Sequence, residues 1–214
     1  MIYDKFLKRL LDIVFSLLSI IILSPAILLI SIIVRIKLGK PVVFLQGRPG
    51  RDERIFTIYK FRTMTNITDE EGRLLSPEER LTRVGAFLRT FGLDELPELW
   101  NILKGDMSFI GPRPLMERYL PLYTPRQRKR HSVRPGLTGL AQAKGRNAVG
   151  WQERFELDLE YIERMSFGMD LRILLMTIRM IISGYGNGPE GPSVMEPFEG
   201  CPDKPKKGIQ QGNQ

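Results

Sequence analysis

The sequence has little of the residues that build metal centres and disulfide frameworks. Its 214 residues include one cysteine, Cys201, and one histidine, His131. These counts exclude an internal disulfide framework, a cysteine-rich zinc or iron–sulfur site and a multi-histidine metal site. We expect Cys201 to be incidental. We expect His131 to lie in a loop or on the surface rather than to act as a catalytic base.

Internal repeats and strong compositional bias are also absent. Hydrophobic residues make up 43% and charged residues 26% of the chain, which excludes a disordered chain, a coiled coil and a collagen-like repeat. The formal net charge is +8. Residues 35–64 hold eight basic and two acidic residues. This cluster indicates a surface attracted to anionic lipid, an anionic substrate site, or both.

Apolar residues are concentrated near the start of the chain. The uncharged run at 13–34 is long enough to cross about 30 Å of hydrocarbon as a helix. A signal peptide is excluded because the run is too long and no small-residue cleavage site follows it. Hydropathy alone leaves a simple spanning anchor open.

Two features of this run argue against a simple span. Ser24-Pro25 lies at its centre, where proline should kink or break a helix. The Ser24 and Ser31 hydroxyls could then serve the freed carbonyls. Basic residues flank both ends of the run, whereas the positive-inside preference places only one end of a spanning helix on the basic side. We therefore expect a re-entrant helix–break–helix that enters and leaves the same leaflet.

The remaining patterns predict an α+β fold that is mainly α. Two β-rich runs, at 42–46 and 55–61, predict a hairpin with a long loop. Helical spacing and helix-boundary signals place helices near 76–89, 93–103, 115–130, 151–165 and 169–183. The last of these has a broad apolar face and belongs either to the core or to the membrane interface.

We accordingly divide the chain into three parts. Residues 1–40 are the membrane-embedded segment with its flanks, and 41–184 are a compact, mainly helical catalytic domain with interfacial amphipathic helices. Residues 185–214 are rich in glycine and proline, which predicts a flexible tail without a core of its own.

Asp94-Glu95 is the sharpest chemical feature. The pair precedes Pro97 at a predicted helix start, so one interpretation is a helix cap, for which aspartate is well suited. In the other interpretation the helix N-terminus lowers the pKa of Asp94 and keeps it ionised. An ionised carboxylate can attack phosphorus to form an acyl phosphate, or it can bind Mg²⁺.

Phosphoryl chemistry also requires cations. Arg89 and Arg113 flank the carboxylates in sequence, and residues 126–146 contain seven basic residues and no acidic one. A run of this kind is commonly a solvated basic face. Here Gly136, Gly139 and Gly145 interrupt it, which instead suggests backbone amides that are free to approach an anion.

Several of these motifs together resemble the bacterial sugar transferases. They are GLDELP at 92–97, GDMSFIGPRP at 105–114, VRPGLTGLAQ at 133–142, IYKFRTM at 58–64, and Ser24-Pro25. More narrowly, the chain resembles the small monotopic phosphoglycosyl transferases that act on polyprenol phosphate. The resemblance extends over roughly residues 3–184 and does not include the tail.

The resemblance implies a specific reaction. A phosphosugar would pass from a UDP-sugar to a polyprenol phosphate, such as undecaprenol phosphate, with release of UMP, as the first membrane step of glycan assembly. Asp94 would be the nucleophile and a ligand of the required Mg²⁺. Glu95 would help to bind Mg²⁺ or deprotonate the acceptor. Substrate phosphates would meet four basic residues: Lys60, Arg89, Arg113 and Arg146.

The resemblance also implies a bacterial cytoplasmic membrane protein with its catalytic domain on the cytoplasmic face and no nucleic-acid partner. Two alternatives come from other classes. A membrane-tethered basic module would bind nucleic acid or anionic lipid, but it does not account for Asp94-Glu95. A lipid-diphosphate phosphatase would release inorganic phosphate instead of UMP.

Overall fold

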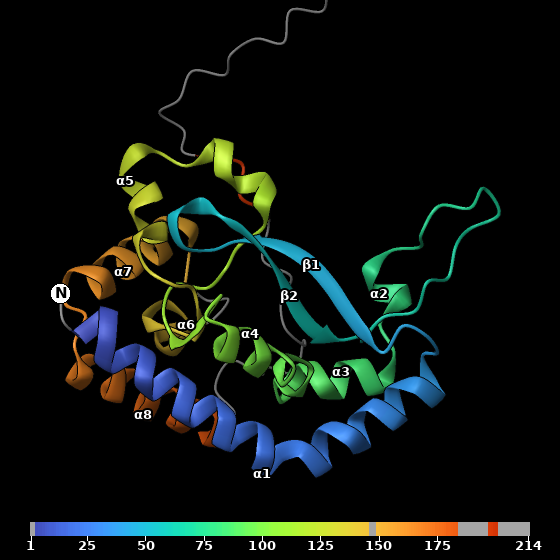
Figure 1. The fold of residues 1–214 in the computed structure, drawn as a ribbon. Helices are drawn as coiled ribbons and strands as arrows, with labels where there is room; N and C mark the ends of the chain where they lie inside the picture. Colours follow the sequence, from blue (N-terminus) through green and yellow to red (C-terminus); the bar gives the residue numbers. More distant parts are fainter. Residues whose placement is uncertain (1–2, 146–148, 184–196, 201–214) are drawn as a thin grey trace, which may run out of the picture.

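The computed structural model describes residues 3–145, 149–183 and 197–200 (Figure 1). Its α-helices are α1 (Lys8–Lys37), α2 (Pro77–Arg80), α3 (Arg83–Thr90), α4 (Glu98–Lys104), α5 (Pro125–Arg128), α6 (Leu140–Gly145), α7 (Trp151–Glu163) and α8 (Phe167–Ser183). The strands are β1 (Val43–Pro49), β2 (Ile55–Phe61), β3 (Ser108–Ile110) and β4 (Gly136–Thr138). Short 3₁₀ segments are η2 (Arg51–Glu53), η3 (Leu93–Glu95), η4 (Glu117–Leu122) and η5 (Lys129–Ser132), and η1 (Tyr3–Leu7) is π-helical. The described part of the chain is thus mainly helical, as the sequence predicts.

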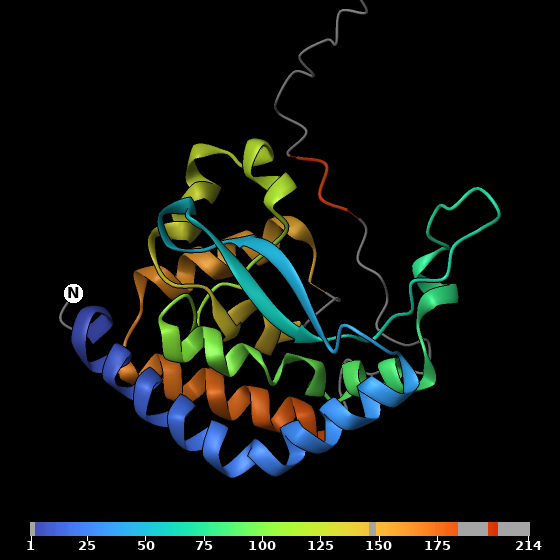
Figure 2. The same cartoon turned by 45° about the vertical axis from the view of Figure 1, so that its right-hand side comes forward.

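Helix α1 is the one described helix long and apolar enough to cross a membrane, with a mean hydropathy of 2.9 in its most apolar window. It runs through Pro25 without ending, so the expected division into two helices is wrong. Figures 1 and 2 instead show one bent helix whose two ends lie on the same side of the bend. The Ser24 hydroxyl donates to the Ile21 carbonyl at 2.8 Å. This is the carbonyl that Pro25, having no N–H, leaves without its usual donor.

Both ends of α1 pack against the rest of the protein. Near the N-terminal end, Lys8 forms a buried ion pair with Asp170 of α8, with 2.5 Å between Nζ and Oδ2. Arg9 donates to the carbonyls of Ile102 and Leu103 at the end of α4, at 2.6 and 2.7 Å. At the other end, a hydrophobic cluster joins α1 to β2 and α3 through Ile30, Val34, Leu38, Phe61 and Leu88. One body therefore holds both arms of the bent helix.

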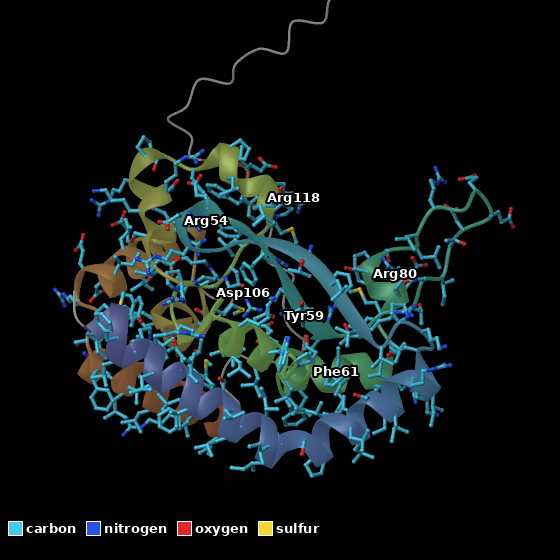
Figure 3. All side chains as sticks on the ribbon, viewed as in Figure 1. Arg54, Tyr59, Phe61, Arg80, Asp106 and Arg118 are labelled. Atoms are coloured by element: carbon cyan, nitrogen blue, oxygen red, sulfur yellow. The ribbon has the colours of Figure 1, made fainter. Side chains whose placement is uncertain are left out.

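Strands β1 and β2 form the predicted hairpin, which is confirmed as an antiparallel pair with Val43 opposite Phe61 and Pro49 opposite Ile55. The hairpin lies over α4, as Figure 3 shows with Tyr59 and Phe61 labelled. Asn101 of α4 is fully buried and fixes this contact. Its amide donates to the Thr57 carbonyl at 2.7 Å, and its Oδ1 accepts from the Tyr59 N–H at 3.1 Å.

A second, parallel pair of strands was not predicted. Ser108 in β3 pairs with Gly136 in β4, and Ile110 pairs with Thr138. A Cβ on Gly136 would lie 2.1 Å from the Gly111 nitrogen, so these backbones approach more closely than any side chain allows. The Gly136 amide donates to the Pro112 carbonyl at 3.0 Å. The expectation that this amide is free to meet an anion is therefore wrong.

Two predicted helices are interrupted and form shorter segments than expected. The helix predicted near 76–89 is divided into α2 and α3, because the Thr82 hydroxyl accepts from the Gly85 amide and starts a new helix. The helix predicted near 115–130 consists of η4, the short α5 and η5. Pro121 and Pro125 lie within this segment, and proline removes the donors that a continuous helix needs.

The C-terminal helices agree with the prediction, and one residue beyond them does not. Helices α7 and α8 share a buried core with β3 and α6 that includes Ile110, Leu140, Leu157, Tyr161 and Ile173. Phe198 is 5% exposed and joins a second cluster with Tyr119, Tyr123 and Phe155. Residues 185–214 are expected to form a flexible tail, and Phe198 departs from that expectation because it packs into this cluster. Cys201 lies outside the described residues.

Candidate active site

The carboxylate pair lies on a tight turn that leads into α4. Gly92 has φ +66°, a left-handed conformation that suits glycine, and the 3₁₀ turn Leu93–Glu95 follows directly. The N-cap position of α4 is Pro97, and no side chain caps this helix. The capping interpretation of Asp94 is therefore wrong, and its carboxylate is not committed to the backbone of α4.

Glu95 is the centre of an ion-pair network. Its Oε1 accepts from Lys60 Nζ at 2.6 Å and from Arg113 Nη2 at 2.7 Å. Lys60 reaches it from β2, and Arg113 reaches it from the loop after β3. Burial by itself raises the pKa of Glu95, but the two cations outweigh burial and lower it. Glu95 is therefore a fixed anion that holds two cations beside Asp94.

Asp94 is buried, with 9% of its surface exposed. Its side chain makes no hydrogen bond or ion pair to another residue in the described parts of the chain. Burial raises the pKa of Asp94 and Glu95 raises it further, while Lys60, Arg89 and Arg113 oppose the shift. The expected lowering of this pKa is therefore wrong. Burial thus disfavours the ionised form of Asp94, and the three cations favour it, which is the form that could attack phosphorus.

Arg89 supports the turn from α3. Its Nε donates to the Thr63 hydroxyl at 3.0 Å, and its charge acts on Asp94. The structure thus brings Lys60, Arg89 and Arg113 around the carboxylate pair. Arg146, the remaining predicted substrate-binding residue, lies outside the described residues.

Glu98 is an acidic residue of the site that was not predicted. It is the first residue of α4, is 2% exposed, and its Oε1 lies 3.1 Å from Lys60 Nζ. Burial, and secondarily Glu95, raises the pKa of Glu98 to about 7. Lys60 is thus placed between two carboxylates. The signal in the sequence is the spacing, because Glu95 and Glu98 share one face of a helical turn.

A second group of unpredicted residues holds Arg113 in place. Arg130 Nη2 donates to the Arg113 carbonyl at 2.8 Å and pairs with Asp158 Oδ2 at 2.8 Å. The side chains of Arg130 and Asp158 are each 2% exposed. Next to them, His131 is buried rather than on the surface, which corrects that expectation. Burial, aided by the charge of Arg130, lowers the pKa of His131 to about 4.

A cavity of about 470 Å³ opens beside the carboxylates. Its polar lining includes Glu95 and three arginines, Arg89, Arg113 and Arg154. Arg154 belongs to α7 and was not predicted. The cavity continues to residues of α1 and α8.

The described residues contain no cluster of three or more histidine, cysteine, aspartate or glutamate side chains that could hold a metal by themselves. Mg²⁺ is commonly held by one or two carboxylates together with substrate phosphates. Asp94 fits such an arrangement because its oxygens bond to no other described side chain. Glu95 fits less well because Oε1 already accepts from Lys60 and Arg113.

Fold and site together define a mainly helical domain that combines a bent apolar helix with a buried carboxylate–cation site. The family model for bacterial sugar transferases matches residues 3–184. The chain belongs to the bacterial sugar transferase family, and the resemblance seen in its motifs is confirmed.

Individual relatives differ in how much of their length the chain covers. The chain is 47% identical over 197 residues to the uncharacterized sugar transferase EpsL of Bacillus subtilis, covering 92% of this chain and 98% of that protein. It is 38% identical to the UDP-N-acetylgalactosamine-undecaprenyl-phosphate N-acetylgalactosaminephosphotransferase of Aeromonas hydrophila, covering 85% of this chain and 45% of that protein. It is 39% identical to the UDP-glucose:undecaprenyl-phosphate glucose-1-phosphate transferase of Klebsiella pneumoniae, covering 80% and 39%. The chain thus spans nearly all of the Bacillus protein and less than half of the other two.

Proposed function

We propose that this protein transfers a sugar phosphate from a UDP-sugar to a polyprenol phosphate, such as undecaprenol phosphate, and releases UMP. The observation that supports the proposal is that two adjacent carboxylates have different surroundings. Asp94 is buried and makes no hydrogen bond to a described residue, while Glu95 is tied to Lys60 and Arg113. One carboxylate is therefore available to react, and the other holds the cations that a diphosphate needs nearby. Relatives of the chain are named as transferases of this kind.

The proposed reaction has two displacements. An Asp94 oxygen attacks the sugar-proximal phosphorus of the UDP-sugar, and the bond from that phosphorus to the bridging oxygen breaks. UMP leaves with the electron pair, and the sugar phosphate is held on Asp94 as an acyl phosphate. An oxygen of the polyprenol phosphate then attacks the same phosphorus, forms the lipid diphosphate and releases Asp94 as a carboxylate.

The side chains around Asp94 have separate roles in this scheme. Arg113 and Lys60 lie where they can neutralise the diphosphate as negative charge builds up on the leaving group. Arg89, near the end of α3, adds a third positive charge that acts on Asp94. When bound, Mg²⁺ held by Asp94 and the substrate phosphates would add a Lewis acid that weakens the repulsion between carboxylate and diphosphate.

We further propose that α1 is re-entrant and that the domain lies on the cytoplasmic face of the bacterial inner membrane. Lys8 and Arg9 bind the same body that Val34 and Leu38 pack against. A helix that crossed the bilayer would separate these two ends by about 30 Å of hydrocarbon, so it could not make both sets of contacts. This placement keeps Asp94 at the depth where a membrane-bound phosphate is found.

The test is product formation from a panel of UDP-sugars with undecaprenol phosphate and Mg²⁺. UMP should appear, and Asp94→Asn should lose activity by several orders of magnitude, because an amide cannot form the acyl phosphate. Glu78→Gln, which changes an exposed carboxylate at the start of α2, is the matched control and should keep full activity. Donor alone should leave a sugar-phosphate mass on the peptide that contains Asp94.

Two results would contradict the proposal. Near-normal turnover by Asp94→Asn would exclude the covalent scheme. Release of inorganic phosphate from a lipid diphosphate, with no UMP from any UDP-sugar, would identify a phosphatase instead.

A further inference from the structure

The cavity beside Glu95 is lined by two chemically different kinds of side chain. Arg113 and Arg154 are cationic lining residues. Leu23 of α1 and Leu174 and Met180 of α8 are apolar lining residues. A cavity that offers both kinds of side chain matches an amphipathic ligand with an anionic head.

Arg154 is the less expected of the two cationic lining residues. It is 5% exposed, and it lies one helical turn before Asp158 on α7. Its guanidinium lies 5.6 Å from the centre of the Trp151 ring. Burial lowers the pKa of Arg154, and the charge of Asp158 opposes this shift. A buried guanidinium in a cavity wall is a strong site for a phosphate, because the charge is poorly screened where the side chain is largely removed from solvent.

The apolar lining residues Leu23, Leu174 and Met180 belong to α1 and α8, two helices whose outer faces are also apolar. Figure 2 shows α8 running beside the first half of α1. On α8 the exposed apolar side chains include Leu171, Leu175 and Ile178, and on α1 they include Leu18 and Ile22. A hydrocarbon chain that leaves the cavity between these helices would therefore continue along apolar surface rather than through water.

We propose that this cavity is the acceptor subsite, in which Arg154 binds the phosphate of the polyprenol phosphate and the first isoprene units lie between α1 and α8. The inference rests on the proposed function and extends it, because it assigns the lipid chain of the acceptor to a binding surface that the donor does not use. Arg113, which the proposed reaction gives to the donor diphosphate, also lines this cavity, so the two substrates use its phosphate site in turn. The Leu23 and Met180 wall matches the hydrocarbon chain of a polyprenol phosphate and does not match the sugar or the diphosphate of the donor.

The two half-reactions allow this subsite to be tested apart from the donor site. UMP formed in the absence of acceptor reports donor binding and attack by Asp94. Turnover at varied polyprenol phosphate reports the acceptor. In Arg154→Gln we expect the UMP burst to keep its size and rate, while KM for the acceptor rises about tenfold or more. Arg154→Lys should recover part of the loss.

A second variant tests the apolar lining of the cavity without changing a charge. Met180→Trp places a larger side chain in the cavity wall and should raise the acceptor KM while the UMP burst is unchanged. Ile182→Trp is its matched control, because Ile182 lies on the same helix, is 80% exposed and does not line the cavity. Arg164→Gln is the control for Arg154, because Arg164 is an exposed arginine that ends the same helix.

The possible results of these experiments distinguish failure of the proposed acceptor subsite from failure of the proposed function. A normal acceptor KM in both Arg154→Gln and Met180→Trp would overturn the subsite and leave the transferase reaction standing. A reduced UMP burst with an unchanged acceptor KM would assign the cavity to the donor and would also overturn it. Absence of UMP from the wild-type protein would instead refute the proposed function. If Arg154→Gln does not fold, Met180→Trp decides alone.

Discussion

The buried ion pair behind Arg113 offers a direct test of how the site is held. Arg130 donates to Asp158 Oδ2 through Nε at 3.0 Å and through Nη2 at 2.8 Å, and both side chains are 2% exposed. Asp158→Asn keeps the shape and one acceptor but removes the negative charge. Because the Arg130 charge then stays buried without its counter-ion, we expect a loss of about 3–5 kcal/mol in the free energy of unfolding.

The same helix supplies a matched control. Glu156 lies two positions before Asp158 on α7 and pairs with Arg126, with 2.6 Å between the charged atoms. Those two side chains are 44% and 64% exposed, so water screens the pair and the two charges remain solvated when it is broken. Glu156→Gln should therefore leave the unfolding midpoint unchanged within experimental error, although it also breaks an arginine–carboxylate contact on α7.

The assay is denaturant unfolding of the protein in detergent micelles, followed by tryptophan fluorescence, together with the rate of UMP release. Asp158→Asn should also slow UMP release under conditions in which it is folded, because Arg130 donates to the Arg113 carbonyl at 2.8 Å. Equal unfolding midpoints for Asp158→Asn and the wild type would refute the reasoning. Equal losses in Asp158→Asn and Glu156→Gln would refute it as well, since burial would then have no role.

Three further predictions concern Glu98, Phe198 and α1. The raised pKa of Glu98, about 7, means that the folded state binds this proton more tightly than the unfolded chain, so stability should fall as pH rises from about 4.5 to 7. Glu98→Gln should flatten that slope in unfolding measured across this range, and an unchanged slope would exclude Glu98 as its source. Phe198→Ala should cost about 3–5 kcal/mol, because Phe198 is buried among four aromatic rings. A chain ended after residue 200 should unfold at the wild-type midpoint, and an equal loss in that truncation would show that Phe198 is not the stabilising contact. Single cysteines placed near Tyr3 and near Lys40, with Cys201 replaced, should both resist labelling in intact cells and label after permeabilisation. Labelling near Tyr3 in intact cells would mean a spanning helix.

Local sequence patterns were sufficient to predict the elements that form between residues close together in the chain. The hairpin follows from two β-rich runs with a turn between them, and α7 and α8 follow from helical spacing. The parallel pair β3 and β4 was not predicted, because each strand is three residues long and β4 begins at a glycine. What stabilises this pair is a close approach of two backbones, which glycine permits and which leaves no periodic signal in the sequence.

The sequence predicts the site only where the functional residues are adjacent in the chain. Asp94 and Glu95 stand next to each other, so the sequence by itself marks them as a reactive pair. Their unequal roles are decided by tertiary structure, because Lys60 and Arg113 both reach Glu95 and leave Asp94 without a hydrogen-bond partner among the described residues. Burial then raises the pKa of Asp94, against the expectation from the helix terminus alone.

The apolar helix shows the same division between sequence and structure. The uncharged run and its central Ser24-Pro25 are sequence properties, and they determine that a long apolar helix forms and where it is weakened. The direction and extent of the bend depend on contacts that come from far along the chain. Lys8 meets Asp170 at one end, and Val34 joins the same hydrophobic cluster as Phe61 at the other. Proline removes one backbone hydrogen bond and so permits a bend, but only the packing of both arms on one body makes the bent form the stable one.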